Sequence, residues 1–472
     1  MYDVKSKVAE EFISHEEILE SIDYARANRN NRKLIEEILE KSRKGQGLTH
    51  REAGVLVECE LEDLNEELFA LARQLKERIY GNRIVMFAPL YLSNYCINGC
   101  TYCPYHAKNK TMPRKQLSQK EIEAEVIALQ DMGHKRLALE AGEHPLNSIE
   151  YILESIATIY NIKHKNGAIR RVNVNIAATT VENYRKLADA GIGTYILFQE
   201  TYNKENYQKL HPYGPKSNYA YHTEAMDRAM EGGIDDVGIG VLFGLTNYLY
   251  DFIGLIMHAE HLEAAHGVGP HTISVPRICP ADDIDVAEFA NALPDEIFHK
   301  IVAVIRISVP YTGMIISTRE SQSSREKVLE LGVSQISGGS HTSVGGYDSA
   351  ETSSEQTTAQ FDVSDHRTLD EVISWLIDLG YVPSFCTACY RLGRTGDRFM
   401  SLVKSGGIAN CCAPNALMTL KEYMVDYASP ETRAKGEKLI AAEMAKVPNE
   451  AVRKRALENL AAIEKGERDF RF

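Results

Sequence analysis

Apolar residues in the first 80 positions recur at three- and four-residue intervals, the spacing of one face of an α-helix. The pattern is clearest in HEEILESIDYARA, RKLIEEILEKSRK and EDLNEELFALARQLKERIYG. Ser14 followed by Glu17 has the composition of a capping box at the start of the first helix, and Gly81 is a typical residue after the last. We therefore predict a helical N-terminal extension over residues 1–80.

A second pattern begins at Arg83, where short β-rich runs alternate with amphipathic helices such as SQKEIEAEVIALQDMG, which Ser118 and Glu121 cap. Such alternation predicts βα units and a parallel sheet. Eight strands over about 255 residues fit a closed (β/α)8 TIM-type barrel, the α/β fold we predict for residues 81–340, and a six-strand partial barrel is the alternative. The predicted strands are 84–90, 135–141, 171–177, 194–200, 237–243, 271–276, 313–318 and 334–339.

The pattern changes again after the predicted barrel. Residues 340–367 are polar and rich in Ser, Thr and Gly, which indicates a linker or an ordered loop. Beyond them the chain is mostly helical, with a capping box at Thr368 and Glu371 and a cysteine-bearing loop between helices. We predict a C-terminal domain over residues 341–472.

The charge and the distribution of apolar residues argue against several classes of function. The formal net charge of the 472 residues is −13, which disfavours a general nucleic-acid partner. The N-terminus has no apolar core of a signal peptide, and no run of about 18 apolar residues occurs. We therefore expect a cytoplasmic protein without a membrane partner.

Six of the nine cysteines fall into two spaced sets, which favours metal chemistry. The other three are Cys59 and Cys279, expected to be small apolar groups, and Cys411.

The first set is Cys96, Cys100 and Cys103, in the segment that follows the first predicted strand. Active sites of β/α barrels lie at the C-terminal ends of the strands. Structural zinc normally takes four ligands, and here the nearest candidate for a fourth is His106. Three thiolates on a four-iron cluster instead leave one iron open for catalysis. A zinc or structural role remains the alternative.

The spacing Cys-x3-Cys-x2-Cys after the first strand of a β/α barrel resembles the radical S-adenosylmethionine (SAM) superfamily, as does the aromatic Tyr102 before the last cysteine. The resemblance implies a 4Fe-4S cluster whose open iron binds the amino and carboxylate groups of SAM. Reduction of that cluster then cleaves SAM to a 5′-deoxyadenosyl radical.

Further positions match the superfamily in part. Gly142 and Glu143 stand where a Gly-Gly-Glu segment contacts the SAM amino group, although Ala141 replaces the first glycine. Glu200, in Gln-Glu-Thr-Tyr after the fourth strand, is a candidate contact for SAM or substrate. A simple turn at residues 141–143 and a surface carboxylate at Glu200 are the alternatives. Gly240 and Gly244 resemble an adenine-side segment only weakly.

The second set is Cys386, Cys389 and Cys412. It again offers three thiolates, which favours a second 4Fe-4S cluster with an open iron. Zinc, with Cys411 or a histidine as the fourth ligand, is the competing interpretation.

The two sets together resemble the tyrosine lyases that mature FeFe-hydrogenase, the HydG family. The similarity covers nearly the whole chain and includes FQETYN, CTACYRLGRTGDRFM and CAPNAL. The nearest related family, 2-iminoacetate synthase of thiamine biosynthesis, is also a tyrosine lyase but lacks the C-terminal cysteines. The resemblance implies radical cleavage of the Cα–Cβ bond of L-tyrosine to p-cresol and dehydroglycine. The latter yields carbon monoxide and cyanide, which iron at the auxiliary cluster captures.

The resemblance also implies an extra labile iron beside the second cluster, and His271 matches the histidine that helps to hold it. For the tyrosine carboxylate, Ser317 and Arg319 follow the seventh strand, and a bidentate arginine suits a carboxylate. On bare sequence, His271 reads as structural and Arg319 as a surface salt bridge.

The family further implies a reductant such as ferredoxin or flavodoxin, the other hydrogenase maturases as partners, and an internal passage from the barrel mouth to the second cluster. Two other readings stay open at this point. One is a non-catalytic iron–sulfur scaffold, and the other is a zinc-binding interaction module.

Overall fold

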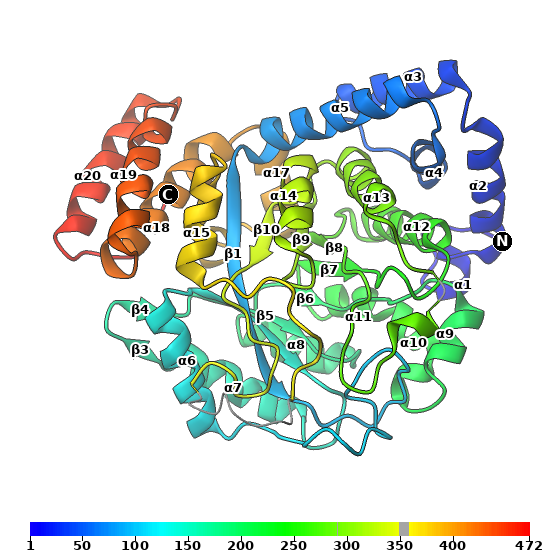
Figure 1. Ribbon diagram of the computed structural model, residues 1–472, viewed down its shortest axis with the longest axis horizontal. Helices are drawn as coiled ribbons and strands as arrows, with labels where there is room; N and C mark the ends of the chain where they lie inside the picture. Colours follow the sequence, from blue (N-terminus) through cyan, green and yellow to red (C-terminus); the bar gives the residue numbers. More distant parts are fainter. Residues whose placement is uncertain (290, 349–357) are drawn as a thin grey trace.

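The computed structural model describes residues 1–289, 291–348 and 358–472, and its centre is a closed parallel barrel (Figure 1). The barrel strands follow one another around the sheet, and the last pairs with the first through Val85 opposite Gln335. This confirms the eight-strand barrel over the six-strand alternative. The strands are β1 (Arg83–Ser93), β2 (Arg136–Ala141), β5 (Arg171–Asn175), β6 (Tyr195–Ile196), β7 (Val237–Gly240), β8 (Thr272–Ser274), β9 (Gly313–Ile316) and β10 (Gln335–Ser337).

Helices surround the barrel and bury the outward apolar face of each strand, as a parallel sheet requires. They are α6 (Gln119–Met132), α7 (Ile149–Asn161), α8 (Val181–Asp189), α9 (Lys204–Leu210), α10 (Tyr219–Thr223), α11 (Ala225–Glu231), α12 (Tyr248–His266), α13 (Asp295–Ser308) and α14 (Gln322–Leu331), with short 3-10 turns η1 (Pro215–Ser217) and η2 (Val286–Glu288). The hairpin β3 (Lys163–His164) and β4 (Gly167–Ala168) follows α7.

The predicted N-terminal helices form and lie against the outer side of α12, α13 and α14 (Figure 1). This second cover explains why α12 is buried on almost every side. The capping box expected at Ser14 forms only in part. The Ser14 hydroxyl accepts from the Glu17 amide, but the Glu17 carboxylate is engaged by Arg51. The N-terminal helices are α1 (Ala9–Phe12), α2 (His15–Asn28), α3 (Arg32–Arg43), α4 (His50–Glu58) and α5 (Glu62–Tyr80).

The C-terminal part is joined to the barrel by a strand that the sequence analysis did not predict. β11 runs parallel to β1, with Arg83 opposite Val382. The elements here are α15 (Leu369–Asp378), β11 (Val382–Ser384), α16 (Ala388–Arg391), α17 (Gly396–Lys404), α18 (Ile408–Asp426), α19 (Pro430–Met444) and α20 (Glu450–Glu464). Capping boxes at Ser118 and at Thr368 are confirmed. The division of the chain at residues 340 and 341 stays a prediction.

The polar segment 340–367 is an ordered loop in its described parts and not a free linker. The Tyr105 hydroxyl donates to the Thr358 carbonyl, and the Tyr91 hydroxyl donates to Gln360. Residues 358–361 therefore lie across the C-terminal mouth of the barrel. Among the described helices, none combines the length and the apolar character needed to cross a bilayer.

Candidate active site

The first cysteine set lies on a loop that one arginine holds in shape. After β1 the chain passes through the three cysteines and returns to the sheet edge at a bridge between Ser93 and Gln116. The Arg114 guanidinium donates to four backbone carbonyls of this loop, among them those of Asn94 and Tyr105 at 2.7 and 2.9 Å. A planar fork with five donors suits this task, because each carbonyl needs its own N–H.

A second loop, after β2, closes against the cysteine loop. A Cβ atom added at Gly142 would lie 2.4 Å from the Tyr95 carbonyl oxygen, so only glycine permits this approach. The Glu143 carbonyl accepts from the Ile97 amide at 2.9 Å, and its carboxylate accepts from Asn98 at 2.7 Å. Burial raises the pKa of the Glu143 carboxyl. Gly142 and Glu143 are therefore packed closely against the cysteine loop.

Both loops open onto a cavity of about 170 Å³ at the C-terminal ends of the strands. Of the residues predicted for the first cluster, SAM and the substrate, Ser317 does not line it; its hydroxyl accepts from the Arg319 amide at 3.4 Å. The structure brings the others together in the cavity wall, namely Cys96, Cys100, Cys103, Tyr102, Gly142, Glu143, Glu200 and Arg319.

The cysteine sulfurs are too far apart to bind one zinc ion together as they stand. Tetrahedral zinc with bonds of about 2.3 Å would place its sulfur ligands about 3.8 Å apart. The sulfurs of Cys96, Cys100 and Cys103 do not all lie within 4.8 Å of one another. Burial raises the pKa of Cys103 to about 11 and raises that of Cys100 as well. These thiols are therefore protonated near neutral pH until a metal displaces the protons.

Glu200 is not a surface carboxylate, because it is buried and paired with Lys216 at 2.7 Å. Burial is the largest single effect and would lower the pKa of Lys216, but the charge and hydrogen bond of Glu200 together with the nearby thiols of Cys100 and Cys103 outweigh it, so the pKa is raised. Glu200 also has a left-handed backbone with φ of 68°, an unusual conformation for a residue other than glycine. Sequence reasoning missed Lys216, which stands in the short 3-10 turn η1.

The cavity also holds a carboxyl group that the sequence analysis did not single out. Glu140 is in β2, four residues after Arg136 and on the same face of the strand, and it lines the cavity. Burial raises its pKa to about 8, although Arg319 opposes the shift. A single carboxylate within an otherwise apolar strand segment was the sequence feature that could have identified Glu140.

Arg319 is held in the cavity wall by an aromatic ring and a cysteine sulfur. Its guanidinium lies 3.7 Å from the centre of the Phe361 ring, and it donates to the Cys279 sulfur at 3.2 Å. Cys279 therefore borders the cavity and is not the isolated apolar group that we expected, whereas Cys59 is buried.

The second cysteine set lies at the opposite, N-terminal end of the barrel. Cys386, Cys389, Cys412 and His271 line one cavity of about 80 Å³ beside Arg83, at the start of β1. The 11 residues of β1 thus separate the two cavities by roughly 30 Å. Cys412 lies within α18, so the expectation of a cysteine-bearing loop was wrong for this residue. The helix carries Cys412 to the wall of the cavity.

The three sulfurs again do not all lie within 4.8 Å of one another, which argues against a single zinc ion. Cys411 is not in the cavity lining, although its sulfur is 3.7 Å from that of Cys412. Hydrogen bonds from Cys389 and Cys411 lower the pKa of Cys412. The Arg136 guanidinium fixes the loop by donating to the Cys386 carbonyl at 2.9 Å.

His271 has the surroundings of a metal-ligating imidazole. Its Nδ1 is 3.3 Å from an Asp236 carboxylate oxygen, and its Nε2 is 2.6 Å from the Tyr390 hydroxyl. A carboxylate behind an imidazole orients the ring and raises its basicity as a ligand. Asp236 and Tyr390 escaped the sequence analysis because they meet His271 only in the fold.

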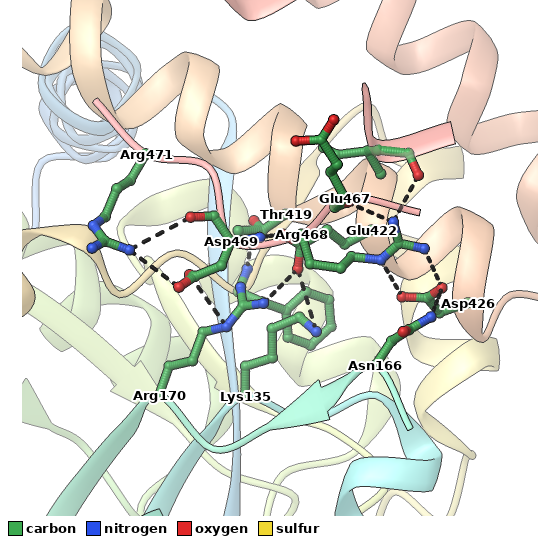
Figure 2. A network of polar contacts seen from close by, with 12 residues as sticks. Lys135, Asn166, Arg170, Thr419, Glu422, Asp426, Glu467, Arg468, Asp469 and Arg471 are labelled. Atoms are coloured by element: carbon green, nitrogen blue, oxygen red, sulfur yellow. Dashed lines mark hydrogen bonds and ion pairs between the residues drawn. The ribbon is translucent and has the colours of Figure 1, made fainter. Parts of the chain in front are cut away.

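Buried charges hold α18 against this end of the barrel (Figure 2). Glu422 is 2.9 Å from Arg170 and 3.4 Å from Lys135, and it accepts from the Asp469 amide at 2.7 Å. The network therefore positions the helix that carries Cys412.

Comparison with known proteins places the chain in a family. Residues 90–256 match the radical SAM superfamily, and residues 274–382 match the biotin and thiamin synthesis associated domain. The crystal structure of HydG, described as a maturase of the [FeFe]-hydrogenase, is 54% identical, with a TM-score of 0.94 over 98% of this chain and 100% of that one. The chain belongs to the HydG family. It is therefore a radical SAM enzyme.

Other HydG-family and related proteins agree with this assignment. The FeFe-hydrogenase maturase HydG from Carboxydothermus hydrogenoformans is 42% identical, with a TM-score of 0.83 over 96% of this chain and 100% of that one. The 2-iminoacetate synthase of Salmonella typhimurium is 29% identical over 323 residues, which are 68% of this chain and 82% of that enzyme. The two matched family regions end at residue 382, before the second cysteine set of the HydG-family chain.

Proposed function

We propose that this protein is a radical SAM tyrosine lyase that cleaves the Cα–Cβ bond of L-tyrosine and supplies carbon monoxide and cyanide for FeFe-hydrogenase maturation. The observation that carries the proposal is the pair of three-cysteine sites at opposite ends of one barrel. Similarity to HydG over nearly the whole chain supports it. Cytoplasmic location, a ferredoxin or flavodoxin reductant and the other hydrogenase maturases as partners belong to the same proposal.

At the first site, Cys96, Cys100 and Cys103 would hold a 4Fe-4S cluster. With SAM, that cluster supplies a 5′-deoxyadenosyl radical, the hydrogen-abstracting species. Glu143 and Asn98 would shape the SAM side of the cavity, since their mutual hydrogen bond lies beside Cys96. The Tyr102 hydroxyl forms a hydrogen bond with Nε2 of His211 at 2.7 Å, which would fix the position of the cysteine loop.

Substrate tyrosine needs a receptor for its carboxylate, and Arg319 is the cation that we assign to it. The guanidinium faces the cavity with a ring and a thiol as neighbours, so its N–H groups toward the cavity suit an incoming anion. Ser317 would act only through the backbone of Arg319. Residues 358–361 cover the mouth and would exclude water from the reactive intermediates.

At the second site, Cys386, Cys389 and Cys412 would hold an auxiliary 4Fe-4S cluster, with His271 as a ligand of an additional labile iron. The iron there supplies the acceptor for carbon monoxide and cyanide. Asp236 would keep the His271 ring oriented with Nε2 toward Tyr390, which follows Cys389 in the chain. The passage between the two sites stays a prediction.

The second candidate function is that of a 2-iminoacetate synthase, which the 29% identical relatives favour. The two functions share tyrosine cleavage and differ in the need for the second site. We expect Cys386→Ser combined with Cys389→Ser to abolish cyanide and carbon monoxide captured on iron, while p-cresol formation persists within about twofold. Product analysis after anaerobic turnover measures all three.

The matched control is Cys411→Ser, because Cys411 touches Cys412 but does not line the cavity. This variant should retain iron-bound products. Equal loss of p-cresol in the double variant would refute the division of labour, and equal loss of products in the control would refute the ligand assignment.

A further inference from the structure

A carboxylate and two imidazoles meet on the outer side of the barrel, away from both cysteine sites. Asp227 of α11 lies between His261 and His266 of α12 (elements in Figure 1). Its Oδ1 atom is 3.0 Å from Nε2 of His261 and 2.7 Å from Nε2 of His266. One ligand atom from each residue lies within 4.8 Å of the others.

The tautomer of His261 is fixed by the chain itself. Its Nδ1 is 2.7 Å from the Val4 carbonyl oxygen, and a carbonyl can only accept, so Nδ1 carries the hydrogen. In the neutral ring, Nε2 then presents a lone pair to the Asp227 carboxylate. Two lone pairs cannot face each other at 3.0 Å without a cation between them.

Two further observations point to a metal ion rather than a proton. The other carboxylate oxygen, Oδ2 of Asp227, is buried and has no hydrogen-bond partner among the described residues. The backbone carbonyl behind His261 is the outer-shell partner that metal-bound histidines usually have. His261 is fully buried and stacks on Phe12 at 3.8 Å, so the ring cannot turn away.

We propose that Asp227, His261 and His266 bind one Zn²⁺ ion. Two neutral imidazoles and one carboxylate are a donor set that zinc accepts. With tetrahedral bonds of about 2.0–2.2 Å, the ion would widen the Oδ1–Nε2 separations from 3.0 and 2.7 Å to about 3.4 Å. The Asp227 Oδ2 atom or a water beside the partly exposed His266 completes the coordination. The ion joins α11 to α12 and fixes residues 1–13 through Val4 and Phe12, so its role is structural.

The site is tested on the anaerobically purified holoenzyme, with both cysteine sites filled, after treatment with a mild chelator. Zinc is titrated, and the X-ray absorption at the zinc edge is recorded at one equivalent. We expect one bound zinc with two imidazoles and oxygen at about 2.0 Å and no sulfur at about 2.3 Å. His266→Gln should weaken zinc binding at least about tenfold.

The matched control is His164→Gln, because His164 lies 3.2 Å from Asp131 in a histidine–carboxylate pair that lacks a second imidazole. This variant should bind zinc as the unmodified protein does. Zinc should also slow trypsin cleavage after Lys5 and Lys7 by about tenfold or more in the unmodified protein and not in His266→Gln.

Three results would overturn the proposal. The first is equal zinc binding by the unmodified protein and His266→Gln, which would leave a metal-free imidazolium–carboxylate cluster. The second is an absorption spectrum with sulfur ligands alone, and the third is equal loss of binding in His164→Gln.

Discussion

Three residues around the first cysteine set have a size or a charge that the fold requires of them. Gly142 is needed for close approach, Glu140 is held neutral by burial, and Lys216 is held charged by Glu200. Each property can be changed by one substitution, which makes the site testable residue by residue.

Replacing Gly142 by alanine should move the cysteine loop, because the new methyl group would meet the Tyr95 carbonyl at 2.4 Å. Misplacement of reacting groups by about 1 Å costs about a hundredfold in rate. We therefore expect Gly142→Ala to lower 5′-deoxyadenosine formation at least about tenfold. Gly269→Ala is the control, since a Cβ there meets nothing closer than 3.9 Å. Equal activity of the two variants would contradict the role given to Gly142.

Glu140 should be protonated at neutral pH, because burial raises its pKa to about 8. A group with a raised pKa keeps its proton below that pKa and loses it as the pH rises through it. Glu140→Gln imitates the protonated form. We expect the variant to match the unmodified enzyme within about twofold at pH 7 and to lack any decline in rate near pH 8. A large loss at pH 7 would show that the carboxylate is the working form.

At the scale of the elements, the sequence patterns predicted the barrel strands and the helix starts because both depend on local spacing. They did not predict β11, since its pairing with β1 joins residues 83 and 382. They also placed Cys412 in a loop, because Pro414 and the cysteines argue locally against the helix that the tertiary packing stabilises. Glu140 and Asp236 were missed for the related reason that their partners, Arg319 and His271, lie far from them along the chain.

The stability of helix α18 in its position should depend more on buried ion pairs than on ion pairs at the surface. Removing the charge of Glu422 leaves Lys135 buried without its carboxylate at 3.4 Å and leaves Arg170 with only its longer contact to Asp469. Such a change typically costs about 3 kcal/mol. We expect Glu422→Gln to lower the urea midpoint of the C-terminal part and to weaken iron retention at the second site. Glu431→Gln, an exposed helix pair with Lys435, should leave both unchanged. An unchanged midpoint in Glu422→Gln would contradict the network's role.

At the scale of the whole molecule, one barrel holds two three-cysteine cavities at its two ends, roughly 30 Å apart along β1. Under the proposed function, this arrangement would separate radical formation from the capture of products. It accounts for a chain that is similar to 2-iminoacetate synthases yet carries a further cysteine set beyond residue 382. The interpretation as a non-catalytic iron–sulfur scaffold predicts that the protein binds clusters but does not cleave SAM. A turnover assay on the reconstituted protein distinguishes the two interpretations.

The most direct measurement is anaerobic reconstitution of the protein with iron and sulfide, followed by incubation with SAM, L-tyrosine and a reductant. The account predicts 5′-deoxyadenosine, p-cresol, cyanide and carbon monoxide together from one sample. A reduced, cluster-loaded protein that leaves SAM intact would contradict it.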